Sequence, residues 1–139
     1  MSNPLAHASF AFMVAAPYAA LSGVGKEMAF IAAIASMLLD LDAVISPSNR
    51  YEHALHSPTV LAISLVAPLV AMLISIGPFI PCLLSLAVTS HLVQDVLQGE
   101  IGLENGIFLG RGNTLFHPKI ANVIDLASIP VSLVFMMLF

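Results

Sequence analysis

Long apolar runs alternate with short polar connections along most of the chain. A helix that crosses a bilayer needs about 20 mainly apolar residues, with about 17 as the practical minimum. Five runs reach this length, and the pattern predicts a helix for each of them. They cover residues 5–21, 28–45, 59–76, 79–97 and 120–139.

The connections between these runs contain the residues that usually end helices. Residues 22–27 include two glycines, so the first two predicted helices form a tight hairpin. Gly77 and Pro78 separate the third helix from the fourth, where proline suits the first turn because its missing N–H costs nothing. The two longer connections, 46–58 and 98–118, concentrate the charged residues in or beside them.

The composition turns this helical pattern into a prediction of a membrane protein. Apolar residues make up 59% of the 139 residues, charged residues 9%, and the mean hydropathy is +1.00. Soluble domains average about 45–50% apolar and about 25% charged residues. We therefore predict an all-α fold, a single transmembrane helical domain spanning residues 1–139 in the bilayer.

Other classes of protein are disfavoured by the same data. The net charge is −4 and lysine and arginine do not cluster, which argues against a nucleic-acid partner. The first apolar run follows no basic segment and precedes no cleavage-type sequence, so it is expected to be a retained helix. Cys82 is the single cysteine, can form no internal disulfide and is expected to pack in an apolar run.

Counting the crossings places the histidines and most aspartates on one side of the membrane. If the N-terminus lies on side A, the connections 46–58 and 98–118 also lie on side A. Asp and His are expensive in a bilayer and mark a functional site or pair with one another. The residues brought to side A are His7, Asp40, Asp42, His53, His56, His91 and Asp95, and also His117 in the last connection.

Imidazole and carboxylate groups together suit zinc or a similar divalent ion. The lack of cysteine clusters argues against a closed structural zinc site, and the lack of oxygen-only clusters argues against a calcium site. We therefore expect an open, hydrolytic site. The predicted ligands of one or two ions are His7, Asp40, His53, His56, His91 and Asp95.

The spacing of these residues allows more than one interpretation. His91 and Asp95 are four residues apart, so both can bind one ion, or the carboxylate can simply hold the imidazole. Asp40 and Asp42 lie on nearly opposite faces of a continuous helix, so both can serve only if the helix ends there. His7 is either a ligand or an anchor at the headgroup level.

Several further residues have proposed roles beside the metal. Asp42 or Glu52 would act as general base or would support a ligand. Arg50 and Arg111 would bind an anionic phosphate, or would anchor the chain at the headgroups. Ser57 precedes Pro58 and therefore suits the N-cap of the third helix. Alternatively, its hydroxyl would hydrogen-bond to a metal ligand without binding the metal itself.

Three short motifs resemble those of a known family. They are Leu38-Leu39-Asp40-Leu41-Asp42, then His56-Ser57 with Arg50 before it, then Ser90-His91-Leu92-Val93-Gln94-Asp95. The chain resembles the membrane-bound metal-dependent hydrolases, an inner-membrane-associated family distantly similar to zinc-dependent phospholipase C. The resemblance implies a multi-helix membrane protein with a zinc-type centre. The matching positions are His7, Asp40, Asp42, His56, Ser57, His91 and Asp95.

The chain also departs from this pattern at two places. Leu39 stands where the family usually has proline. Tyr51 and Glu52 occupy the positions of the expected His-Arg pair, so either His53 replaces the missing histidine from a shifted place or the site has lost a ligand. The number of metal ions therefore stays open between one and two.

The leading hypothesis is a membrane-embedded metal-dependent hydrolase that acts at the bilayer face on a phosphoester or lipid-like substrate through metal-activated water. The alternatives are a proton-relay or transport protein and a noncatalytic metal-binding membrane module. Arg50, Arg111 and Lys119 on side A outnumber Lys26 on side B. The positive-inside rule therefore places the N-terminus and the site on the cytoplasmic side of the cell membrane.

Overall fold

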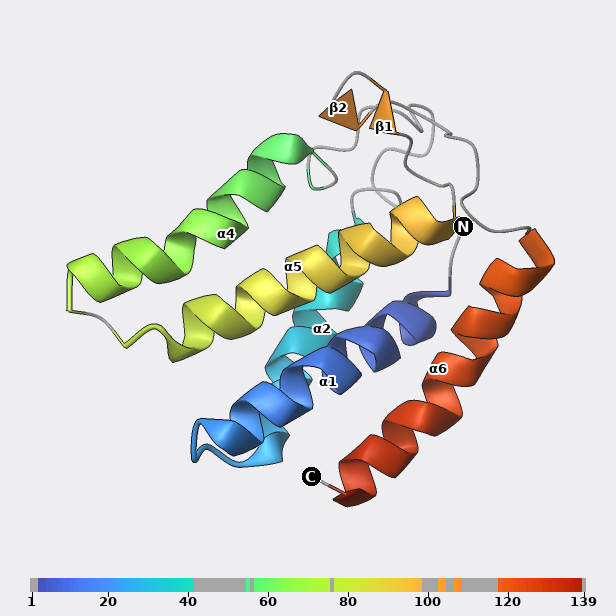
Figure 1. Cartoon of the computed structure of the whole chain (residues 1–139), viewed down its shortest axis with the longest axis horizontal. Helices are drawn as coiled ribbons and strands as arrows, with labels where there is room; N and C mark the ends of the chain where they lie inside the picture. The colour runs from blue at the N-terminus through green and yellow to red at the C-terminus, as the bar shows by residue number, and fades with distance from the viewer. Residues whose placement is uncertain are drawn as a thin grey trace.

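The computed structural model describes residues 3–41, 55, 57–75, 77–98, 103–104, 107–108 and 118–138. This part of the chain is all-α, with five helices (Figure 1). The helices are α1 (Pro4–Leu21), α2 (Ala29–Leu39), α4 (Pro58–Leu73), α5 (Phe79–Gln98) and α6 (Pro118–Leu138). A 3-10 turn, η1 (Lys26–Met28), precedes α2, and two short antiparallel strands, β1 (Leu103–Glu104) and β2 (Ile107–Phe108), follow α5.

The predicted helical fold is confirmed, and one helix differs clearly from its prediction. The apolar run 28–45 predicted a long second helix, but α2 ends at Leu39. The N–H of Asp40 bonds to the carbonyl of Met37 at 3.2 Å, a tight turn that ends the regular α-helix. Residues 42–45 lie outside the described residues. The small β1–β2 pair was not predicted.

Side-chain caps fix where two helices begin. The side chain of Asn3 accepts a hydrogen bond from the N–H of Leu5 at 3.0 Å, and Pro4 follows as the first helical residue. Ser57 accepts a hydrogen bond from the N–H of Val60 at 3.3 Å, as its sequence context predicted. These caps satisfy N–H groups that have no partner within the helix.

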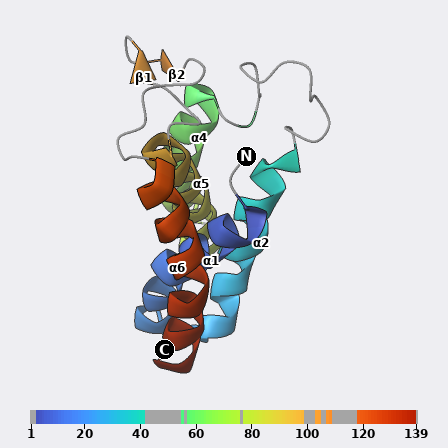
Figure 2. The same cartoon turned by 90° about the vertical axis from the view of Figure 1, so that its right-hand side faces the viewer.

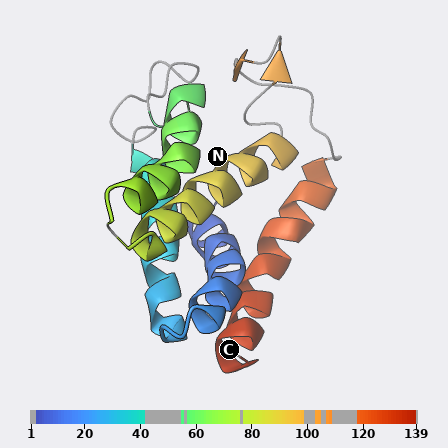
Figure 3. The same ribbon diagram turned by 60° about the vertical axis from the view of Figure 1, so that its left-hand side comes forward.

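Successive helices run in opposite directions, so their ends gather at two ends of the bundle. Helix α1 packs against α2, α5 and α6, and α4 packs against α5. Figures 2 and 3 show α1, α4 and α6 beginning, and α2 and α5 ending, at one end, which we call the A end. The α1–α2 turn and the end of α6 lie at the other end, where the Lys26 ammonium donates to the carbonyl of Met136.

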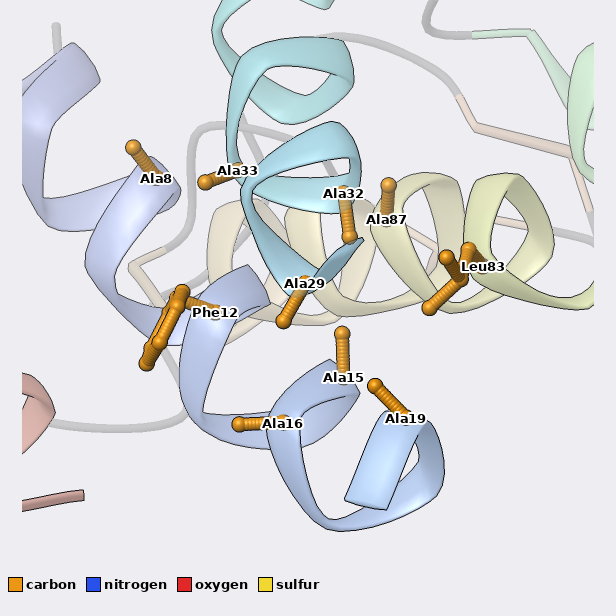
Figure 4. Packing of buried hydrophobic residues seen from close by; sticks show 10 residues of the cluster. All are labelled: Ala8, Phe12, Ala15, Ala16, Ala19, Ala29, Ala32, Ala33, Leu83 and Ala87. Carbon is orange, nitrogen blue, oxygen red and sulfur yellow. The ribbon is translucent and has the colours of Figure 1, made fainter. Parts of the chain in front are cut away.

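The interior of the bundle is built from small side chains (Figure 4). Alanines of α1, α2 and α5 meet there with almost no exposed surface, and small residues let helix backbones approach closely. The cluster is Ala8, Phe12, Ala15, Ala16, Ala19, Ala29, Ala32, Ala33, Leu83 and Ala87. Phe12 also packs on Phe30, with ring centroids 4.9 Å apart.

Large apolar side chains lie mainly on the outside of the bundle. Ile63 on α4 is 63% exposed, and Leu126 on α6 is 73% exposed. By length and composition, Pro4–Leu21 and Phe79–Leu97 are long and apolar enough to cross a membrane, a test that the core helix of a soluble protein also passes. The apolar segments Thr59–Leu73 and Asn122–Leu138 are shorter.

The alanine interface predicts a sharp contrast between two positions of α1. Ala16 is fully buried in the interface, whereas Ala20 is exposed. We expect Ala16→Leu to lower stability by about 1–3 kcal/mol, because the added carbons have no space between close helices. Ala20→Leu, the matched control, should leave stability unchanged. Thermal unfolding in detergent measures both, and equal melting temperatures would contradict this packing.

Candidate metal centre

Four ionisable side chains from three helices converge at the A end. His7 lies at the end of the first turn of α1, Asp40 caps the C-terminus of α2, and His91 and Asp95 lie one turn apart near the end of α5. Because α2 ends at Leu39, the side chain of Asp40 is not held on a continuous helix and can turn toward α5.

The contacts within this group are short and specific. The Nε2 atom of His7 lies 3.2 Å from Oδ1 of Asp95. The Nε2 atom of His91 lies 3.3 Å from Oδ2 of Asp95 and 3.6 Å from Oδ1 of Asp40. The two imidazole rings stack with centroids 4.1 Å apart and planes inclined by 28°. Each oxygen of Asp95 therefore faces a different histidine.

The group is buried except at one side. The side chains of His7 and His91 have no exposed surface, that of Asp95 is 4% exposed, and that of Asp40 is 18% exposed. Burying carboxylates is costly unless they are paired with charge or hydrogen bonds. Among these four side chains, Asp40 is therefore the one past which an ion or a water molecule would most easily reach the cluster.

The spacing of the donor atoms fits a shared metal ion. Charge-assisted N–H···O bonds are usually about 2.7–2.9 Å long, and the contacts of Asp95 and Asp40 with the histidines are longer. Zinc bonds of about 2.0–2.1 Å in tetrahedral geometry place neighbouring ligand atoms about 3.3–3.4 Å apart. Donor atoms of His7, Asp40 and His91 all lie within 4.8 Å of one another, so these three residues could hold one ion.

The charges of the cluster point the same way. Asp40 and Asp95 contribute two negative charges where the histidines are neutral, which is the form that binds metal. A divalent cation would balance these two charges. Lys26 cannot balance them, because it lies at the opposite end of the bundle, where its ammonium donates to the carbonyl of Met136.

A serine of α2 contacts the ring nitrogen of His91 that does not face the carboxylates. The Oγ atom of Ser36 lies 3.2 Å from Nδ1 of His91, and both side chains are fully buried. Metal-binding histidines almost always use their second nitrogen in such a hydrogen bond, which fixes the orientation of the ring. Ser36 thus leaves the Nε2 atom of His91 facing Asp40 and Asp95.

Helix α6 contributes a third carboxylate beside this group. The buried amide of Gln94 donates through Nε2 to Oδ1 of Asp125 at 2.7 Å, and Asp125 acts electrostatically on His7. The hydroxyl of Ser128 donates to the carbonyls of Ala6 and Asp125. A groove of about 320 Å³ opens next to these contacts. Its lining is Asn3, Ala6, Asn122, Asp125, Leu126 and Ile129.

The structure places some of the predicted site residues and leaves others outside its description. His7, Asp40, His91 and Asp95 come together, and Ser57 is the N-cap of α4. The remaining predicted residues lie outside the described residues, and their roles stay predictions. They are Asp42, Arg50, Glu52, His53, His56, Arg111 and His117.

Sequence reasoning missed three members of the site region: Ser36, Gln94 and Asp125. Ser36 precedes Asp40 by four residues, and Gln94 directly precedes Asp95, but polar residues of these types are common in helices. Asp125 is the strongest missed signal, because it is an acid within an otherwise apolar run.

Comparison with known proteins does not assign this chain to a family. The chain matches no family model, no curated protein and no solved structure. The resemblance to membrane-bound metal-dependent hydrolases therefore stays a hypothesis, and the site must be argued from its own residues.

The contact between Gln94 and Asp125 predicts a measurable coupling between α5 and α6. Asp125→Leu should lower the free energy of unfolding by about 1–3 kcal/mol, because a buried amide loses its acceptor. Asp125→Asn keeps an oxygen at that place and should cost less.

The double variant Gln94→Leu with Asp125→Leu removes both partners and should regain much of the stability lost by Asp125→Leu alone. Chemical unfolding in detergent gives all three free energies. Additive losses in the double variant would show that the two side chains do not interact.

Proposed function

We propose that the chain is a membrane-embedded metal-dependent hydrolase that acts at its A end on a phosphoester or lipid-like substrate. The observation that carries this proposal is the convergence of His7, Asp40, His91 and Asp95 from three helices. Neutral imidazole and carboxylate are the ligand set of many hydrolytic zinc sites.

The distribution of side chains supports a membrane location. Alanine, serine, histidine and aspartate fill the interior, while leucine, isoleucine, valine and methionine cover much of the outer faces of α4 and α6. Soluble monomers rarely expose such large contiguous apolar surface. In lipid this arrangement is favourable, because lipid solvates large apolar groups and small residues allow close helix packing.

The donor geometry supports a catalytic use of the metal. A bound zinc-type ion would polarise a phosphoryl or acyl oxygen and lower the pKa of water to about 7. The chain would hold the ion through His7, Asp40 and His91. Asp95 would be a fourth ligand, because its Oδ2 atom faces the Nε2 atom of His91 that would bind the ion. Asp40 is the most exposed of the four, so substrate would approach from its side.

The sequence motifs support the class of substrate. Their resemblance to membrane-bound metal-dependent hydrolases, and more distantly to zinc-dependent phospholipase C, favours a phosphoester. Asp42 or Glu52 as general base, and Arg50 and Arg111 as phosphate ligands, belong to this proposal. So do the cytoplasmic orientation and a second ion bound with His53 and His56.

The deep burial of the cluster favours a second candidate, a noncatalytic module in which a metal joins α1, α2 and α5. In that case the metal would stabilise the bundle without turning over a substrate. A proton relay is less well supported, because the described ionisable cluster lies at the A end while the α1–α2 turn carries only Lys26 and Glu27.

Metal analysis of the purified protein tests the site directly. We expect about one equivalent of zinc or a similar ion per chain in detergent, and its loss in His7→Ala and His91→Ala, because each removes a ligand atom. Glu27→Gln is the matched control at the opposite end and should retain the metal. Inductively coupled plasma mass spectrometry measures the content, and a metal-free wild-type protein would end the proposal.

An activity assay separates the hydrolase from the noncatalytic module. The protein should remain with membranes that are washed in alkaline carbonate, as an integral membrane protein does. When it is placed in phospholipid vesicles, it should release phosphate esters from the lipid. A chelator should stop the release, zinc should restore it, and Asp95→Asn should reduce it by about 10–100-fold, the loss typical of a disturbed metal site. Metal binding without any hydrolysis would favour the noncatalytic module.

A further inference from the structure

We propose that Ser36 is a positioning residue of the metal site, whose hydroxyl holds the imidazole of His91 in both the metal-free and the metal-bound protein. This inference rests on the metal site proposed above. It concerns a residue in the middle of α2 that belongs to none of the sequence motifs.

The contact of Ser36 differs from those of other serines in this bundle. Ser64, Ser90 and Ser132 each donate to the carbonyl three residues earlier in their own helix. Such bonds are the usual way for a helical serine to satisfy its hydroxyl. Ser36 instead reaches across to Nδ1 of His91 on α5, at 3.2 Å.

The two nitrogens of His91 have opposite surroundings. Nε2 faces the carboxylates of Asp40 and Asp95, and Nδ1 faces the hydroxyl of Ser36. Without metal, the neutral ring is best paired with its proton on Nε2, which donates to a carboxylate, while Nδ1 accepts from the hydroxyl. With metal, Nε2 must offer its lone pair, so the proton has to sit on Nδ1.

A hydroxyl group serves both arrangements because it can donate and accept. Ser36 donates to Nδ1 in the first arrangement and accepts from Nδ1–H in the second. One proton leaves Nε2 and one arrives at Nδ1, so the ring stays neutral. A backbone carbonyl in the same place could only accept and would lose its bond in the metal-free protein.

The surroundings make Ser36 a clean position to test. It lies in the same helix as the buried residues Ala32 and Ala33, and it is itself fully buried. Alanine fits wherever serine fits, so Ser36→Ala removes one oxygen without adding volume. Ser90→Ala is the matched control, because Ser90 directly precedes His91 and is also buried, but its hydroxyl bonds within α5.

The first measurement is the affinity of the full-length protein for zinc, by competition with a chromophoric chelator in detergent. We expect Ser36→Ala to bind zinc about 10–100-fold more weakly, since loss of the partner of a metal-bound histidine typically has this effect. Ser90→Ala should bind like the wild type. Ser36→Thr keeps the hydroxyl and should bind more tightly than Ser36→Ala, even if its extra methyl group lowers stability.

The second measurement is the position of the His91 proton, from nitrogen NMR of histidine-labelled protein with and without zinc. The expected result is a proton on Nε2 without zinc and on Nδ1 with zinc, assigned by comparison with His91→Ala. A purely structural serine would not make the zinc affinity depend on its hydroxyl.

The outcomes separate this inference from the proposed function. If the wild-type protein binds no metal, both are wrong. If it binds zinc but Ser36→Ala binds equally well, or if Nδ1 of His91 carries no proton in the zinc-bound protein, the metal site stands and the role of Ser36 is overturned.

Discussion

The pairing of Asp95 with both His7 and His91 is the interaction on which the rest of the A end depends. A carboxylate with 4% of its side chain exposed needs compensation from its neighbours. The two imidazoles supply it from two helices, one contact to each oxygen. This requirement fixes how α1 and α5 are placed along each other. It also brings the ring of His91 against Asp40 and Ser36 of α2.

The alanine interface and the polar cluster are two parts of one arrangement. Small side chains between α1, α2 and α5 let the backbones approach closely (Figure 4). Histidine and aspartate side chains are short enough to meet across helices only when the backbones are that close. Larger residues in the interface would move the helices apart and separate the donor atoms, so the apolar core sets the dimensions of the polar site.

The sequence predicted the helical fold well because apolar length and helix caps are local properties. Helices α1, α5 and α6 begin and end close to the predicted positions, and Ser57 caps α4 as expected. The early end of α2 was missed, because no proline or glycine directly follows Leu39 and the apolar pattern continues to Ile45.

The convergence of His7, Asp40, His91 and Asp95 was predictable because ionisable groups stand out against an apolar background, and counting crossings brought them to one side. The positions that support them were not. Ser36 and Gln94 are ordinary helical residues until their contacts are known, and the partner of Asp125 is 31 residues away in the chain.

The position of Asp40 has a consequence for which ions the site can accept. His7, His91 and Asp95 stand on regular helix, whose backbone hydrogen bonds fix their direction, whereas Asp40 stands just beyond the last residue of α2. Helix ends fray more readily than helix interiors, so the carboxylate of Asp40 is the least constrained of the four donors. Three rigid donors and one adaptable donor would tolerate ions of different radius. Selectivity at such a site would come from the preference of an ion for nitrogen ligands, and not from the size of the cavity.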